Sequence, residues 1–222
     1  MRNDTVNLRP FPLSPEKKMS RAEAERWIAS QSEAVRRVTF AADDGSILQR
    51  PLIEEGAYVD PTAVLIGGMI IRPGCYIGPH AVIRLDEKAS PEPFIMDEGS
   101  NLQDCAVIHS TATRIGKRVI VAHQAVVHGA AIEDDVTIYI QAVVDGSGTV
   151  IGKGSFLHQG SYVGKGIRVP EGRLVEPGRK VLVQADADRL PPVPDTLKAL
   201  AEHVLEHNQS HVRKYLALAQ RQ

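Results

Sequence analysis

The chain has 222 residues, of which 43% are hydrophobic and only 5% aromatic, and its 26 Lys and Arg residues almost balance its 27 Asp and Glu residues. A net charge of −1 excludes the strongly basic surface that favours nucleic acid or an anionic membrane as a partner, and no apolar run is long enough to span a bilayer. The first residues lack the apolar core of a secretory signal and two cysteines cannot build a disulfide framework, so we expect a cytoplasmic protein.

Residues 1–56 form the first of three predicted regions, an N-terminal extension that precedes a repeat. Ser20 and Glu23 have the spacing of a capping box, and apolar residues follow at helical spacing. We therefore expect one helix from Ser20 to about Arg37. Residues 40–55 are expected to form a short turn or hairpin, because an Asp-Asp-Gly-Ser sequence lies within them.

Residues 57–185 carry a hexapeptide repeat, in which an aliphatic residue recurs every six positions with three slips of one residue and an excursion at 85–95. The repeat positions are Val59, Leu65, Ile71, Ile77, Ile83, Met96, Leu102, Ile108, Ile115, Val121, Val127, Ile132, Ile138, Val144, Ile151, Leu157, Val163, Val169, Val175 and Val181. Such hexads predict short strands, three to a coil, that stack into a triangular prism with the repeat positions along its axis. Small residues precede many of these positions, and Cys105 is expected to be buried among them.

Residues 186–222 are predicted to be a linker followed by a C-terminal helix that packs on the prism. A Pro-Pro-Val-Pro segment is followed by leucines and valines at helical spacing. His203, His207 and His211 recur at intervals of four on this helix, which is a spacing that can bind a metal ion. The favoured interpretation is a polar helix face packed on the prism.

Three hexads per coil divide the repeat positions into three columns, and one column places site candidates together. This column contains Ile83, Ile108 and Val127 on adjacent coils, and Arg84, His109 and His128 directly follow them. Residues one coil apart are about 4.8 Å apart, which is the spacing of paired strands. Two imidazoles at that spacing can converge on one metal ion. His123 follows Val121, which belongs to a different column, so it is expected to project from another edge of the prism. The spacing thus predicts a metal shared between the chains of a homotrimer.

The segments "AVIRLDE", "SNLQDCAVIH" and "AHQAVVHG" resemble, in that order, the motifs of the γ-class carbonic anhydrases, and the resemblance covers roughly residues 57–218. It implies an all-β fold with flanking helices, namely a left-handed parallel β-helix with a C-terminal α-helix. It also implies that His109, His123 and His128 hold the metal, with His123 donated by the adjacent subunit. Arg84 and Asp86 would form an intersubunit salt bridge.

The same resemblance implies roles for four further residues. Gln103 and Asn101 would hold the metal-bound water and the substrate, and Asn208 on the terminal helix would face the site. Glu87 would carry the proton away. Zn²⁺ is the expected metal, with Fe²⁺ and Co²⁺ as alternatives, because three neutral imidazoles suit all of them. Such a cation lowers the pKa of its water to about 7, and hydroxide then converts CO₂ to bicarbonate.

One departure keeps other functions open. The prototype enzymes carry a long acidic loop between the first two histidine ligands, and the segment from His109 to His123 lacks it, as in the short-loop form of the family. A metal-dependent thioester hydrolase and a coenzyme A-dependent acyltransferase on the same fold are alternatives, although transferases generally use one histidine and no metal. A catalytically weak scaffold or binding protein is the third alternative.

Overall fold

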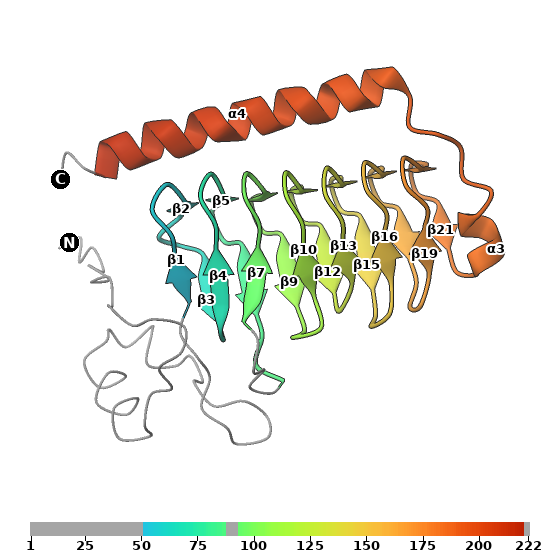
Figure 1. Ribbon diagram of the computed structural model, residues 1–222, viewed down its shortest axis with the longest axis horizontal. Coiled ribbons are helices and arrows are strands. Elements are labelled where there is room, and N and C mark those ends of the chain that lie inside the picture. The colour runs from blue at the N-terminus through green and yellow to red at the C-terminus, as the bar shows by residue number, and fades with distance from the viewer. Residues whose placement is uncertain (1–50, 88–92, 220–222) are drawn as a thin grey trace, which may run out of the picture.

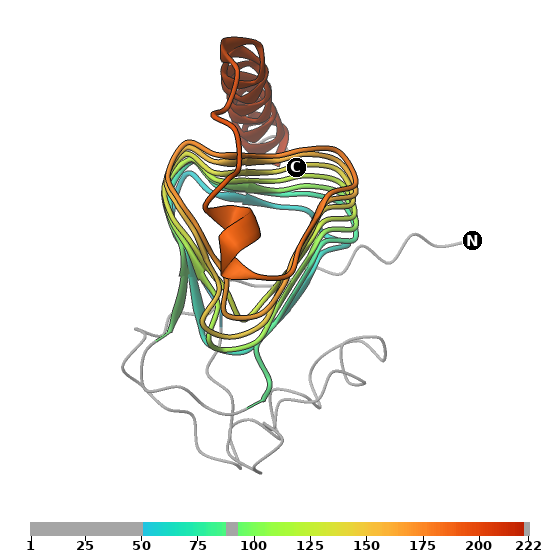
Figure 2. The same cartoon turned by 90° about the vertical axis from the view of Figure 1, so that its right-hand side faces the viewer.

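The computed structural model describes residues 51–87 and 93–219, so the predicted helix at 20–37 and most of the predicted turn at 40–55 lie outside the described residues. The described chain forms three parallel sheets of seven strands each, and successive strands of the chain belong to successive sheets. Viewed along its axis, the molecule has the triangular cross-section of a prism (Figure 2). The predicted left-handed parallel β-helix of hexapeptide repeats is confirmed.

The three sheets are named by the order in which the chain first enters them. The first sheet contains β1 (Leu52–Ile53), β4 (Met69–Ile71), β7 (Phe94–Met96), β10 (Arg114–Ile115), β13 (Ala131–Ile132), β16 (Val150–Ile151) and β19 (Arg168–Val169). The second sheet contains β2 (Tyr58–Val59), β5 (Tyr76–Ile77), β8 (Asn101–Leu102), β11 (Ile120–Val121), β14 (Thr137–Ile138), β17 (Phe156–Leu157) and β20 (Leu174–Val175). The third sheet contains β3 (Val64–Ile66), β6 (Val82–Arg84), β9 (Val107–His109), β12 (Val126–His128), β15 (Val143–Asp145), β18 (Tyr162–Val163) and β21 (Lys180–Val181).

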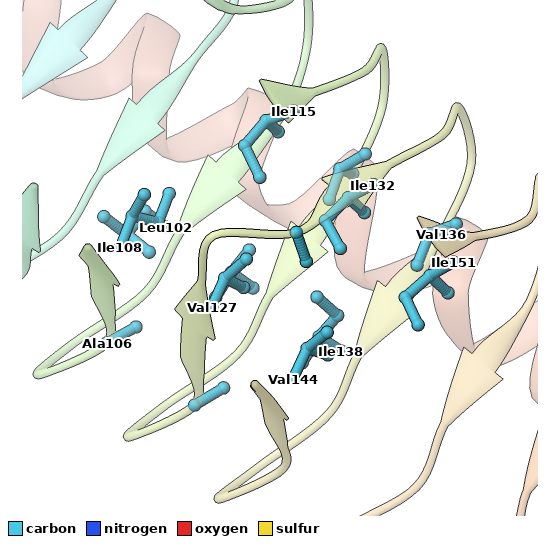
Figure 3. Packing of buried hydrophobic residues seen from close by; sticks show 14 of the residues in the cluster. Leu102, Ala106, Ile108, Ile115, Val127, Ile132, Val136, Ile138, Val144 and Ile151 are labelled. Carbon is cyan, nitrogen blue, oxygen red and sulfur yellow. The ribbon is translucent and has the colours of Figure 1, made fainter. Parts of the chain in front are cut away.

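The axis of the prism is filled by the repeat positions, each of which lies in a strand. Side chains from consecutive coils stack on one another toward the interior, as Ile108, Val127 and Val144 do (Figure 3). These three side chains are fully buried. Because strand side chains alternate between the two faces of a sheet, the residues on either side of each repeat position point outward. The alternation leaves the interior dry and puts the polar residues that carry chemistry on the outer faces.

Two details of the prism differ from expectation. The first strand, β1, precedes residue 57, so the β-helix begins inside the segment assigned to the N-terminal extension. The excursion at 85–95 is shorter than predicted, because Leu85 and Phe94 at its two ends are buried in the core.

The corner between the second and third sheets is built from residues in the left-handed backbone conformation. His80, Cys105, Gln124 and Gln141 occupy equivalent places on successive coils and have φ angles between 56° and 59°. The prediction that Cys105 is buried is therefore wrong: it is an exposed corner residue, and Ala106 takes the buried position beside Ile108. The hexad period fixes which residues point inward, but it does not separate the corner residue from its buried neighbour.

Two helices follow the last coil. The short α3 (Gln184–Ala187) lies across the end of the prism with Ala187 buried, and α4 (Asp195–Ala219) runs back along the prism toward its first coil (Figures 1 and 2). Leu205 of α4 packs against Ile120 and Ala122 of the second sheet. The predicted C-terminal helix is confirmed, and it covers the outer face of the second sheet.

Candidate functional site

The third sheet brings Arg84, His109 and His128 together at the exit ends of three adjacent strands. Arg84 pairs in register with His109, and His109 pairs with His128, each one coil further along the prism. Because each of these residues follows a buried repeat position, its side chain points outward. The two imidazole rings stack with their centroids 5.1 Å apart and their planes inclined by 17°. The next residue in this column is Asp145, which pairs with His128.

The carboxylate of Asp145 defines the orientation of the His128 ring. His128 Nδ1 lies 2.9 Å from Asp145 Oδ1, and the Tyr162 hydroxyl donates to Asp145 Oδ2 at 3.0 Å. The hydrogen bond from His128, followed by that from Tyr162, lowers the pKa of Asp145, and the same carboxylate raises the pKa of Tyr162. A carboxylate only accepts, so Nδ1 carries the proton and the lone pair of Nε2 is left for a ligand.

Glu87 reaches the same edge from the start of the excursion. One oxygen of its carboxylate and one nitrogen each of His109 and His128 lie within 4.8 Å of one another. Ser110 Oγ donates a hydrogen bond of 2.9 Å to Glu87 Oε2, which fixes the carboxylate beside the rings. Within one chain, this cluster of a carboxylate and two imidazoles has the donor types that bind Zn²⁺ and related transition metals.

Arg84 and Asp86 pair with each other and with His109 inside one chain. Arg84 Nε lies 3.0 Å from Asp86 Oδ1, although the geometry is not that of a hydrogen bond, and one guanidinium nitrogen lies 3.1 Å from His109 Nε2. The Arg84 side chain is half exposed, at 51%. The pair expected between subunits thus forms within the chain described here, and an intersubunit pair stays a prediction.

His123 lies at a different corner of the prism from His109 and His128. It lines a pocket of about 460 Å³ between the second sheet and α4, whereas His109 and His128 line a pocket of about 370 Å³ on the third sheet. Its backbone carbonyl accepts a hydrogen bond from Gln141, and the adjacent Gln124 donates to the Asp104 carbonyl. These bonds anchor the corner, and the His123 side chain is left 51% exposed.

Gln103 and Asn208 line the same pocket as His123, and Asn101 contacts Gln103. The Gln103 amide nitrogen donates to Asn101 Oδ1 at 3.0 Å, so the Gln103 carbonyl oxygen is the group that is free to face the pocket. Both side chains are buried, and Asn101 Nδ2 has no hydrogen-bond partner among the residues that the structure describes. Asn208 is tied to α4 by a hydrogen bond of 2.8 Å to the Val204 carbonyl.

The structure therefore divides the predicted site residues into two groups. One group lies where the chain leaves the third sheet, which we call the exit edge, and consists of Arg84, Asp86, Glu87, His109 and His128. The other group lies at the corner where the chain enters the third sheet, which we call the entry corner. The entry-corner group consists of Asn101, Gln103, His123 and Asn208.

Sequence reasoning missed the residues that support this site. Asp145, Tyr162 and Ser110 were not singled out, although the columns hold the signal for two of them: Asp145 follows Val144 as His128 follows Val127, and Tyr162 precedes Val163 on the next coil. The helix histidines His203, His207 and His211 do face the prism, but they line the pocket that contains His123.

A divalent cation fits the donor set at the exit edge. His128 presents a free Nε2 because Asp145 takes its Nδ1–H, which is the carboxylate–histidine arrangement found around many protein zinc sites. The Glu87 carboxylate, which lies within 4.8 Å of one nitrogen of each imidazole, also suits a positive charge. Three imidazoles can surround one ion if His123 of a second chain meets His109 and His128 of the first.

No protein-family model matches the chain. Among curated proteins it is similar to the carnitine operon protein CaiE of Citrobacter koseri, with 34% identity over 110 residues that cover 48% of this chain and 52% of the relative. It is also similar to CaiE of Escherichia coli K12, with 35% identity over 114 residues that cover 50% and 55%. The chain thus aligns with about half the length of these relatives.

Two solved structures show the same fold. A hexapeptide transferase family protein from Anaplasma phagocytophilum aligns with a TM-score of 0.63 and 24% identity over 74% of this chain and 92% of its own. A Bacillus cereus protein of proposed acetyltransferase activity aligns with a TM-score of 0.64 and 23% identity over 77% and 94%. At such identities the likeness establishes the fold alone. In residues 51–87 and 93–219, no helix is both long and apolar enough to cross a membrane.

Proposed function

We propose that the chain is a metal-dependent carbonic anhydrase that acts as a homotrimer. Its hexapeptide-repeat fold, its motifs that resemble those of the γ-class carbonic anhydrases and its similarity to CaiE over about half of that protein support the proposal. The proposed reaction is the reversible hydration of CO₂ to bicarbonate at the subunit interfaces. One observation carries the proposal: two stacked imidazoles, one with a free Nε2, lie at one edge of the third sheet, and the exposed His123 lies at the other.

The third sheet supplies the surface for such an assembly. The chain enters this sheet past His123 and leaves it at His109 and His128, so both groups border the same outer face. Half-buried valines run down that face: Val82, Val107, Val126 and Val143. If the third sheets of three chains face one threefold axis, the valines are buried and the exit edge of each chain meets the entry corner of the next.

His109 and His128 of one chain and His123 of its neighbour are the proposed ligands. When bound, a divalent cation held by three neutral imidazoles supplies an acidified water at neutral pH. Gln103, held by Asn101, presents its carbonyl oxygen to accept a hydrogen bond from the attacking water. Asn208 lies beside it on α4 and narrows the space in which CO₂ is placed.

Glu87 and Arg84 have supporting roles at the exit edge. Glu87, oriented by Ser110, lies near both imidazoles and accepts a proton from the water. In the proposed assembly, the exposed Arg84 turns toward Asp86 of the neighbouring chain, which stabilises the contact between subunits.

A second candidate is a metal-dependent thioester hydrolase. The pocket beside α4 has a volume of about 460 Å³, which is much larger than CO₂ requires. An acyl-thioester would use the same water and the same Gln103 as its hydrogen-bonding partner. Acyl-CoA hydrolysis is therefore measured beside CO₂ hydration.

The test uses the full chain purified without oxygen and reconstituted with Zn²⁺ or Fe²⁺. We expect one metal ion per chain, and CO₂ hydration in stopped-flow measurements that the His128→Ala substitution abolishes. A metal-replete trimer that hydrates no CO₂ would refute the proposal, and acyl-CoA hydrolysis by that trimer would replace it with the second candidate.

A further inference from the structure

The histidines of α4 form a cluster of titratable side chains that the proposed site leaves without a role. His203, His207 and His211 line the pocket that His123, Gln103 and Asn208 also line. We infer that His207 and His211 accept the proton released by CO₂ hydration and pass it to solvent, with His203 as the outer member of the chain of imidazoles. This inference rests on the proposed function and adds to its first proton acceptor, Glu87, a route by which protons reach solvent.

The spacing of the three rings suits proton transfer along the helix. Residues four apart lie on one face of a helix, and the His207 and His211 ring centroids are 4.4 Å apart in an edge-to-face arrangement. The His203 and His207 centroids are 6.4 Å apart, a gap wide enough for one water molecule to bridge. His207 directly precedes Asn208, so it is the helix histidine that lies beside the proposed site.

Exposure changes along this row of rings. His211 is half-buried against the prism, where its ring packs near those of Tyr76 and Tyr215, whereas His203 and His207 are exposed in the single chain. A proton taken up inside the pocket can thus reach solvent without moving the helix.

The surroundings of His211 make its imidazole a weaker base than a free histidine. Burial, followed by His207 and Lys214, lowers the pKa of His211, and the Asp104 carboxylate opposes this effect. The other titratable groups that line the pocket are Tyr76, His123, Tyr139 and Tyr215. An imidazole whose pKa is lowered accepts protons less strongly but releases them to buffer readily.

The reaction requires such a route. Each hydration consumes one CO₂ and one water and yields one bicarbonate and one proton, which must reach a buffer base before the next turnover. Residues 110–122 contain no Asp or Glu, so the segment between His109 and His123 supplies no carboxylate for this purpose. Glu87 is held by Ser110 at the exit edge, whereas the helix histidines line the opposite side of the composite site.

The test compares the wild-type trimer with the double variant His207→Ala/His211→Ala across a series of buffer concentrations. Proton transfer limits kcat at low buffer, whereas kcat/KM reports the conversion of CO₂ before the proton leaves. We expect kcat at low buffer to fall by about 100-fold and kcat/KM to change by less than about twofold. Added imidazole should restore kcat.

Two controls make the result specific. His80→Asn replaces an exposed corner histidine outside the pocket with a residue that tolerates positive φ, so kcat should not change. Glu87→Gln tests whether Glu87, the acceptor in the proposed function, delivers the proton to solvent without the helix histidines: if this variant shows the buffer-dependent loss and the double variant does not, the inference is overturned.

A measurement that does not depend on turnover completes the test. In the metal-free protein, nitrogen NMR of labelled histidines should show that the His207→Ala substitution raises the pKa of His211, because the neighbouring imidazole is one of the groups that lower it. If the pKa of His211 does not respond to that substitution, or if the double variant keeps the wild-type dependence on buffer, the relay is overturned. A wild-type trimer without CO₂ hydration overturns the proposed function first and the relay with it.

Discussion

Asp145 provides a direct test of how the prism prepares a histidine for metal binding. Replacing it by alanine removes the acceptor of the His128 Nδ1–H bond, which is 2.9 Å long, and frees the ring to rotate or change tautomer. Tyr162→Phe is the graded variant, because it removes only the hydroxyl that fixes Asp145. Neither substitution touches the atoms proposed to contact the metal.

The expected loss of metal affinity follows from how exposed His128 and Asp145 are. Loss of a carboxylate that supports a metal-binding histidine costs about 10- to 100-fold in affinity, or about 1.4–2.7 kcal/mol. Since the Asp145 side chain is 42% exposed, solvent screens the interaction and we expect the lower end, a loss of about 10- to 30-fold. Tyr162→Phe removes one hydrogen bond to Asp145 and should lower the metal affinity by about threefold.

The measurement is the dissociation constant of Zn²⁺ or Co²⁺ in competition with a chelator. Asp195→Ala serves as the control, since that carboxylate lies 97% exposed at the start of α4 and pairs only with Lys198 among the described residues. An unchanged affinity in Asp145→Ala, or coordination of the metal by Nδ1 of His128 in a metal-loaded structure, would refute the reasoning.

The effect of Asp145 on metal affinity should not depend on pH near neutrality. The folded-state pKa of Asp145 is lowered, so the support that its carboxylate gives to His128 is fully present above the ordinary carboxyl pKa of about 3.9. This support is lost only as pH falls through the lowered pKa. The ratio of wild-type to Asp145→Ala affinity should therefore stay constant between about pH 6 and pH 8. A ratio that changes across this range would mean that another group supports His128.

The remaining predictions concern the shared site and the core. His123→Ala should lose the metal while Glu87→Gln retains it, as measured by metal analysis after gel filtration; the reverse result would make Glu87 the third ligand. Val126→Glu on the third sheet should yield monomers in light scattering, whereas Val150→Glu on the first sheet should leave the trimer intact. Ile138→Ala empties a fully buried position on the axis and should lower the free energy of unfolding by about 2–5 kcal/mol in chemical denaturation. A cost below about 1 kcal/mol would show that the core relaxes around the lost side chain.

The fold could be predicted from the sequence because a single period determines it. Each repeat position between Val59 and Val181 lies in a strand, and the register of Arg84, His109 and His128 follows from counting hexads. Local exceptions to the period were harder to predict. Cys105 is shifted by one residue from the buried position, and only its left-handed backbone explains why it points to solvent.

The two edges of the candidate site were predictable for the same reason, but its surroundings were not. Asp145 belongs to the same column as His128, yet a lone acidic residue on an outer face has many interpretations until its hydrogen bonds to His128 and Tyr162 are known. The placement of His207 depends on how the segment after α3 directs α4 across the second sheet. Nothing in the helical spacing states which coil a given turn of α4 faces.

The narrowness of the prism links metal binding to assembly. Its axis is filled by buried aliphatic side chains, so the proposed site has to lie on the outside, and the two edges that carry its histidines are separated by the width of the third sheet. In the proposed homotrimer, a metal held by edges of different chains would stabilise the assembly, and the assembly would in turn raise the affinity for the metal. The two interface variants separate these contributions: Val126→Glu removes the metal by preventing assembly, whereas His123→Ala removes the metal and leaves the valine surface to hold the chains together. If His123→Ala also dissociated the chains, the metal and not the valines would be the main source of the assembly free energy.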